Sequence, residues 1–196
     1  MNITRLTVVN ACLASMGEDP INSLAETNAF VNSSLFALEQ ATINEQMPGW
    51  WFNKEQIKLL PDVNGKYVVP SDVIDLDIDS NPPWMSLRQN RIYNNALGDY
   101  HTGSSPLRAN IIRLVPFDDL PVIARRMVKA AAVLLFQQSY DGDAAKIRDA
   151  ETEYTMARNQ MRVQHIRAVK ATIGTRGYAT VALNMYDYPG RLRTPR

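Results

Sequence analysis

Hydrophobic residues in the first fifty positions recur at intervals of three and four, the spacing that places side chains on one face of a helix. In the first segment these residues are Ile3, Leu6, Val9, Leu13 and Met16. Gly17 follows them, and glycine readily adopts the left-handed conformation that ends a helix. The pattern predicts a helix over 3–16 and a second helix from about Ala25 to Met47, which Pro48 and Gly49 end. We expect these two helices to pack as an antiparallel pair.

The hydrophobic period changes in the middle third of the chain. Ile57 and Leu59 alternate with polar residues, and segments 67–69 and 73–74 have the β-branched and aromatic composition of strands. Asn64-Gly65 lies between such segments and is typical of a hairpin turn. Further short strands are predicted at 85–87, 91–93 and 110–115, with a loop over 103–106. The middle third is therefore predicted to form a small β region. Trp50-Trp51-Phe52, at its start, is expected to anchor the core, although such rings can also stack on bases or sugars.

Helical periodicity returns at Asp118, where an acid can cap free amide groups and Pro121 is tolerated in a first turn. The predicted third helix has a broad apolar face that includes Ile123, Met127, Val128, Ala130, Leu134, Leu135 and Phe136. A fourth helix is predicted over 144–169, with a narrow seam of Ile147, Ala150, Tyr154, Ala157, Met161 and Ala168. That seam could pack on the third helix or on a neighbouring subunit, and intramolecular packing is the favoured interpretation.

No amphipathic period continues after Lys170, and glycine and proline interrupt the remaining segment. Such a segment buries too little surface alone to offset an ordering cost of roughly 1–2 kcal/mol per residue. The chain is therefore assigned to the α+β class, as an antiparallel bundle of about four helices interrupted by a small β domain. The predicted divisions are 1–49 and 117–170 for the two halves of the bundle, 50–116 for the β insertion and 171–196 for an extended C-terminal interaction tail.

Charge is distributed unevenly along the 196 residues, although the formal net charge is only +1. Residues 158–196 contain eight Lys or Arg and one acid, a net charge of +7, so the rest of the chain has a net charge of −6. A basic end on an acidic body indicates an interaction with an acidic protein surface or with nucleic acid, a solvated surface being the alternative. No secretion signal or long apolar run is recognised, which predicts a soluble protein without a membrane partner.

The chain contains residue types that can carry out catalysis or bind metals, but their spacing does not match a catalytic or metal-binding motif. Cys12, the single cysteine, is expected to be a buried core thiol. Asp75, Asp77 and Asp79 resemble the start of a calcium loop but lack its later glycine and glutamate, which favours a polar strand face. Asp99, His101 and Ser104 or Ser105 lie too close in sequence for a hydrolytic triad. His165 is expected on a basic helix face, and no cofactor or metal is predicted.

Four segments resemble the tail tubular protein A family of short-tailed bacteriophages. They are Val8–Leu24, Gly49-Trp50-Trp51-Phe52-Asn53, Leu59-Leu60-Pro61-Asp62 and the run from Asn110 to Pro121. The resemblance implies a helical bundle interrupted by a β domain, which agrees with the periodicity. It also implies a non-enzymatic adaptor of the virion, assembled from subunits made in the host cytoplasm.

The family resemblance further implies a set of partners. They are the portal protein, the tail nozzle protein (tail tubular protein B), the tail fibre, further copies of the chain in a dodecameric ring, and double-stranded DNA passing through the channel during ejection. A tail-associated glycan hydrolase is kept as the alternative function, and a DNA-binding module is a weaker one. The residues expected to bind the portal are Arg176, Tyr178, Tyr186, Tyr188, Arg191, Arg193 and Arg196. Arg158 and Arg162 are expected to form a basic helix face that meets an acidic protein surface.

Overall fold

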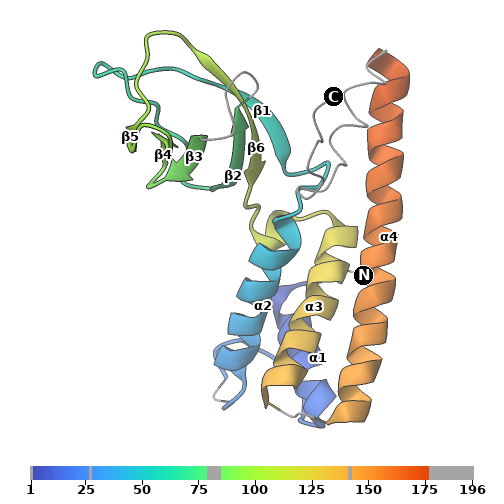
Figure 1. Cartoon of the computed structure of the whole chain (residues 1–196). Coiled ribbons are helices and arrows are strands. Elements are labelled where there is room, and N and C mark those ends of the chain that lie inside the picture. The colour runs from blue at the N-terminus through green and yellow to red at the C-terminus, as the bar shows by residue number, and fades with distance from the viewer. Residues whose placement is uncertain (1, 27, 79–84, 141–142, 177–196) are drawn as a thin grey trace.

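The computed structural model describes residues 2–26, 28–78, 85–140 and 143–176. Helices gather at one end of the molecule and strands at the other (Figure 1). The helices are α1 (Arg5–Met16), α2 (Val31–Gln46), η1 (Phe117–Asp119, a 3-10 turn), α3 (Val122–Tyr140) and α4 (Ala144–Arg176). The strands are β1 (Lys54–Leu59), β2 (Val73–Ile78), β3 (Met85–Arg88), β4 (Arg91–Asn94), β5 (Asp99–Tyr100) and β6 (Leu107–Arg113). The predicted α+β class, with a β region inserted between two halves of a bundle, is confirmed.

The first helix ends at Met16 as predicted and begins two residues later than predicted, at Arg5. Thr4 and Thr7 form a reciprocal capping box at its start, and Gly17 ends it in the left-handed conformation with φ of 84°. The second helix begins six residues later than predicted, at Val31. Before it, the Glu26 carboxylate accepts hydrogen bonds from two backbone amides, Asn22 N at 2.8 Å and Ser23 N at 2.9 Å. These side-chain bonds stabilise a turn that competes with the helix.

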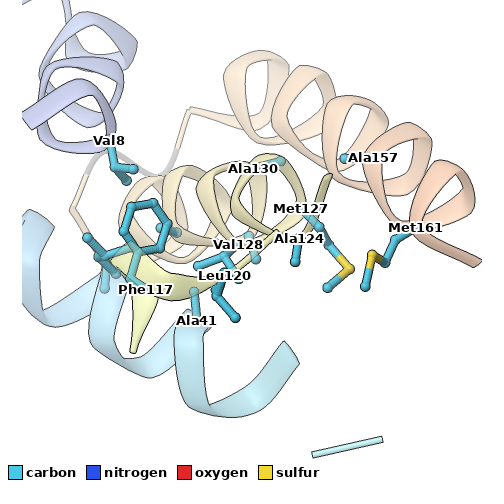
Figure 2. Close-up of a cluster of buried hydrophobic side chains, with 14 of the residues drawn as sticks. Val8, Ala41, Phe117, Leu120, Ala124, Met127, Val128, Ala130, Ala157 and Met161 are labelled. Carbon is cyan, nitrogen blue, oxygen red and sulfur yellow. The ribbon is translucent and has the colours of Figure 1, made fainter. Parts of the chain in front are cut away.

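The helical core joins all four α-helices and η1. Figure 2 shows Val8 of α1, Phe117 of η1 and the apolar face of α3 in one cluster, with Met127 of α3 pointing toward Met161 of α4. Ala157 and Met161 are buried in this cluster. The seam predicted for the fourth helix therefore packs on α3 within the same chain, as the favoured interpretation expected.

The β region consists of two antiparallel sheets with the strand orders β1-β6-β2 and β3-β4-β5. At Asn64-Gly65 the chain turns tightly, with Asp62 N donating to Lys66 O at 2.8 Å. The hairpin predicted around this turn is reduced to a single bridge between Pro61 and Tyr67. β1 pairs along its whole length with β6 instead, which comes about fifty residues later in the chain. Local turn chemistry therefore predicted the turn but not the strand pairing.

The last helix is longer than predicted. α4 continues to Arg176, whereas its periodicity ended at about residue 169. Gly174 is one of the glycines that were expected to interrupt the segment after Lys170, but it lies within the helix, where a glycine costs only about 1 kcal/mol relative to alanine. α4 runs past the bundle toward the level of the β region (Figure 1). The rest of the predicted tail, 177–196, lies outside the described residues.

Candidate functional site

One long basic helix contains the site residues that the structure can place. The side chain of Asp143 starts α4 by accepting a hydrogen bond from Ala145 N at 2.8 Å. Arg162 is exposed, as expected of a basic face. Arg158 is half-buried, and its guanidinium lies 5.8 Å from the centre of the Tyr154 ring. The two arginines therefore have different environments, and Arg162 is the freer of the two to meet a partner.

A buried polar contact holds α4 against α2. The Tyr154 hydroxyl donates to Glu45 Oε1 at 2.6 Å, and Trp50 Nε1 donates to the Glu45 carbonyl, also at 2.6 Å. Burial, followed by the hydrogen bond and the charge of Glu45, raises the pKa of Tyr154 to about 12. The phenol therefore stays protonated as the donor at neutral pH. This contact fixes α4 beside the start of the β region.

His165 is part of the core and not of a basic face, so the expectation for this residue was wrong. Its Nδ1 accepts a hydrogen bond from Trp51 N at 3.1 Å, and its ring meets the Trp50 ring edge to face at 5.4 Å. Burial, with a smaller contribution from the charge of Lys54, lowers the pKa of His165. The expectation that Trp50 is a core residue is confirmed.

Two buried amides, which the sequence analysis did not single out, connect the bundle to the β region. The Gln46 side chain donates to Val115 O at 2.8 Å and accepts from Val115 N at 2.9 Å, as a neighbouring strand would. The Asn53 side chain accepts from Trp50 N at 2.7 Å and donates to Arg113 O at 3.0 Å. They join the chain entering the β region to the chain leaving it. Each amide lies near a predicted element boundary, which is too weak a signal to identify such a role.

A groove lies on the outer side of α2. It has a volume of about 520 Å³ and lies between α2 and the segment that connects β6 to η1. Its lining residues are Arg5, Asn32, Leu35, Phe36, Leu38, Glu39, Thr42, Ile43 and Leu114 to Phe117. Phe36 is 61% exposed, although it is a large aromatic residue. Arg5 pairs with Asp118 at 2.9 Å. The groove is thus mainly apolar with charged residues in its lining.

The remaining candidates from the sequence occupy ordinary structural positions. The Cys12 side chain is fully buried, and burial raises its pKa to about 11. Asp75 and Asp77 are exposed and alternate with less exposed residues along β2. The His101 ring stacks on the Tyr67 ring at 5.6 Å. Asp79 lies outside the described residues.

Neither a metal centre nor a membrane span is found in the part of the chain that the structure describes. Within those residues, no group of three or more His, Cys, Asp or Glu side chains is placed to hold a metal ion. Within the same ranges, no helix combines the length and apolar character needed to cross a bilayer.

The proposed portal-binding residues can be placed only in part. Arg176 is the last residue of α4, and its side chain is not described. Tyr178, Tyr186, Tyr188, Arg191, Arg193 and Arg196 lie outside the described residues. Their role in binding a portal remains a proposal based on the sequence.

Comparison with protein families supports the resemblance found in the sequence. A family model described as tail tubular protein matches residues 6–171, which include both halves of the bundle and the whole β insertion. A search of curated proteins finds no match. Because the family match spans far more than half of the 196 residues, the chain belongs to the tail tubular protein family and is a structural component of a bacteriophage tail.

Proposed function

We propose that the protein is the adaptor that forms a dodecameric ring between the portal and the tail nozzle of the virion. The observation that supports this most is the family match over 6–171, because it includes the bundle and the β insertion together. In this role the ring continues the channel for DNA ejection, binds the nozzle protein below it and helps to attach the tail fibres. Subunits are made in the host cytoplasm and join the virion during assembly.

The connection between the bundle and the β region suits an adaptor that must hold two partners in a fixed relative position. Gln46 and Asn53 are 1% and 0% exposed, and each bonds backbone groups on both sides of the insertion. Buried, satisfied amides of this kind restrict relative motion of the parts that they join. A subunit built in this way would hold surfaces at its two ends in a fixed relation.

Binding to the portal is assigned to the segment that follows α4. This helix leads past the bundle on the side of the β region, so its last residue, Arg176, lies beyond the bundle (Figure 1). The segment contains arginine and tyrosine residues, the types that most often dominate interface energies. Ordering a segment without a core of its own would occur on the partner.

Mixing the full-length protein with the portal of the same phage tests the proposal. The expected product, seen by electron microscopy, is a dodecameric ring on one face of the portal. Deleting 177–196 should leave a folded helical protein that no longer binds, because α1–α4 and the β region retain their cores. Replacing Arg191, Arg193 and Arg196 together with Ala is the milder variant, and it should weaken binding. Failure of the full-length chain to bind would refute the adaptor role, and unchanged binding after the deletion would place the portal contact elsewhere.

A further inference from the structure

The two outermost faces of the helical bundle are apolar but differ from each other. On α2, Phe36 is exposed beside the groove, and Leu35 and Ile43 line the same hollow. Phe36 and Ile43 lie away from the buried side of α2, which includes Ala41 and Glu45, whereas Leu35 packs partly against a buried cluster around Val9. α2 therefore presents a concave apolar face outward from the core.

On α4, three large apolar residues are exposed. They are Met156, Val163 and Ile166, which are 59%, 48% and 46% exposed. Met156 and Val163 are seven residues apart, so they lie on one side of the helix, opposite the seam that contains Met161. A core-facing helix needs one apolar stripe, and α4 has a second that no described part of the chain covers.

The two faces also have opposite charge. Residues 6–53, which include α2 and all of α1 except Arg5, contain five carboxylates and no Lys or Arg, and Arg5 itself pairs with Asp118. Residues 154–176 of α4 contain five Lys or Arg and no acid. Glu39 lines the groove on α2, while Arg162 and Arg167 are exposed beside Val163 on α4. Complementary charge of this kind guides the approach and orientation of two surfaces.

We infer that the outer face of α4 in one copy packs into the groove on α2 of the next copy. The two helices flank α3 in the bundle (Figure 1). The groove lies on one of them and the apolar stripe on the other. A contact between unlike faces is head-to-tail, and such contacts form rings when the rotation between copies closes. This inference rests on the proposed ring and adds to it the surfaces through which subunits meet.

Single-cysteine variants test the contact directly. The native Cys12 is fully buried and its pKa is raised to about 11, so it adds little background reaction with maleimides. Phe36→Cys places a thiol on the α2 face and Val163→Cys places one on the α4 face. Packed helices lie ~8–10 Å apart, so facing thiols come within reach of a short bismaleimide.

The expected pattern is specific to a head-to-tail contact. A mixture of the two variants, at high protein concentration and again with portal, gives a covalent dimer. Either variant alone gives none, and the double variant gives a ladder of covalent oligomers. Leu97→Cys is the matched control, because Leu97 is 79% exposed but lies in the β region. Its mixture with Val163→Cys stays monomeric. High salt lowers the yield for the Phe36 and Val163 pair.

The outcomes separate this contact from the adaptor role. Covalent dimers from Phe36→Cys alone, or a mixed yield no greater than that of the Leu97 control in both conditions, overturn the inference. If portal still gathers the protein into rings in which the mixed pair does not react, the contact is refuted while the adaptor role stands. If the pair reacts but portal does not bind, the contact stands and the adaptor role fails.

Discussion

Asn53 is the residue whose loss should most disturb the connection between the bundle and the β region. Its side chain is fully buried and makes three hydrogen bonds, to Trp50 N at 2.7 Å, Arg113 O at 3.0 Å and Gln46 O at 3.2 Å. In the Asn53→Ala protein, the Trp50 amide loses this acceptor and the Arg113 carbonyl loses a donor. The Gln46 carbonyl still accepts from Gly49 N. Two buried backbone groups at about 1–3 kcal/mol each give an expected destabilisation of about 2–6 kcal/mol.

Urea unfolding measures this loss. Tryptophan fluorescence reports on the connection itself, because Trp50 is buried there, and circular dichroism at helical wavelengths reports on the bundle. With a slope of about 2 kcal/mol per molar urea, in the middle of the typical range, the midpoint should fall by about 1–3 M. Asn44→Ala is the matched control, since Asn44 is exposed on α2, and it should change stability by less than about 0.5 kcal/mol. A destabilisation below about 1 kcal/mol for Asn53→Ala would show that these amide bonds do not hold the two parts together.

Three further predictions concern buried side chains of the bundle. Because burial lowers the pKa of His165, protonation favours the unfolded chain, so stability should be full above about pH 6.5 and fall at lower pH. His165→Asn, which keeps an acceptor for Trp51 N, should flatten that dependence in thermal unfolding measured across pH, and an unchanged slope would contradict this. Met161→Ala should lower the free energy of unfolding in urea by about 2–5 kcal/mol. Met156 is exposed on the same helix, and Met156→Ala should lower it by less than about 0.5 kcal/mol. Equal effects would place Met161 outside the core. The Cys12 thiol should react with Ellman's reagent only as fast as the protein opens, and rapid reaction under native conditions would refute its burial.

Elements that depend on local chemistry were predictable from the sequence. Gly17 ends α1 as expected, because a left-handed residue there needs no distant partner. The seam on α4 was also predictable, since apolar residues repeated at this spacing lie on one face of a helix and pack against another helix. The family assignment depended on similar short runs of sequence, and the family match confirms it.

Features that depend on distant partners could not be predicted in this way. β1 pairs with β6 and not with the nearer segment around Tyr67, and nothing in either segment alone specifies that choice. His165 was assigned to a basic face because arginines surround it in sequence, yet the Trp51 amide and the Trp50 ring enclose it. Burial of a polar residue depends on whether a partner comes to it through the fold.

Three exposed cations of α4 have no ion-pair role within the part of the subunit that the structure describes. Arg162, Arg167 and Lys170 belong to none of the ion pairs found within the described ranges, which join Arg5 to Asp118 and Arg113 to Glu55 and Asp72. Exposed ion pairs add little to stability in any case. Exposed cations outside ion pairs affect the approach of a partner instead, and two negatively charged partners are available in the proposed ring, the acidic α1 and α2 side of the next subunit and the DNA in the channel.

The chemistry of ejection distinguishes these two partners. A strip of unpaired cations facing the channel would bind phosphates and retain the DNA, with an affinity that depends steeply on salt. If the same cations face the acidic side of the neighbouring subunit, they contribute to the contact between subunits and do not bind the DNA that passes through the channel. The apolar residues Met156 and Val163 point to the second arrangement, because phosphate backbones offer them no complementary surface, whereas the groove beside Phe36 does. The exposed cations and the exposed apolar residues of α4 therefore both favour a protein, and not DNA, as the partner of this helix.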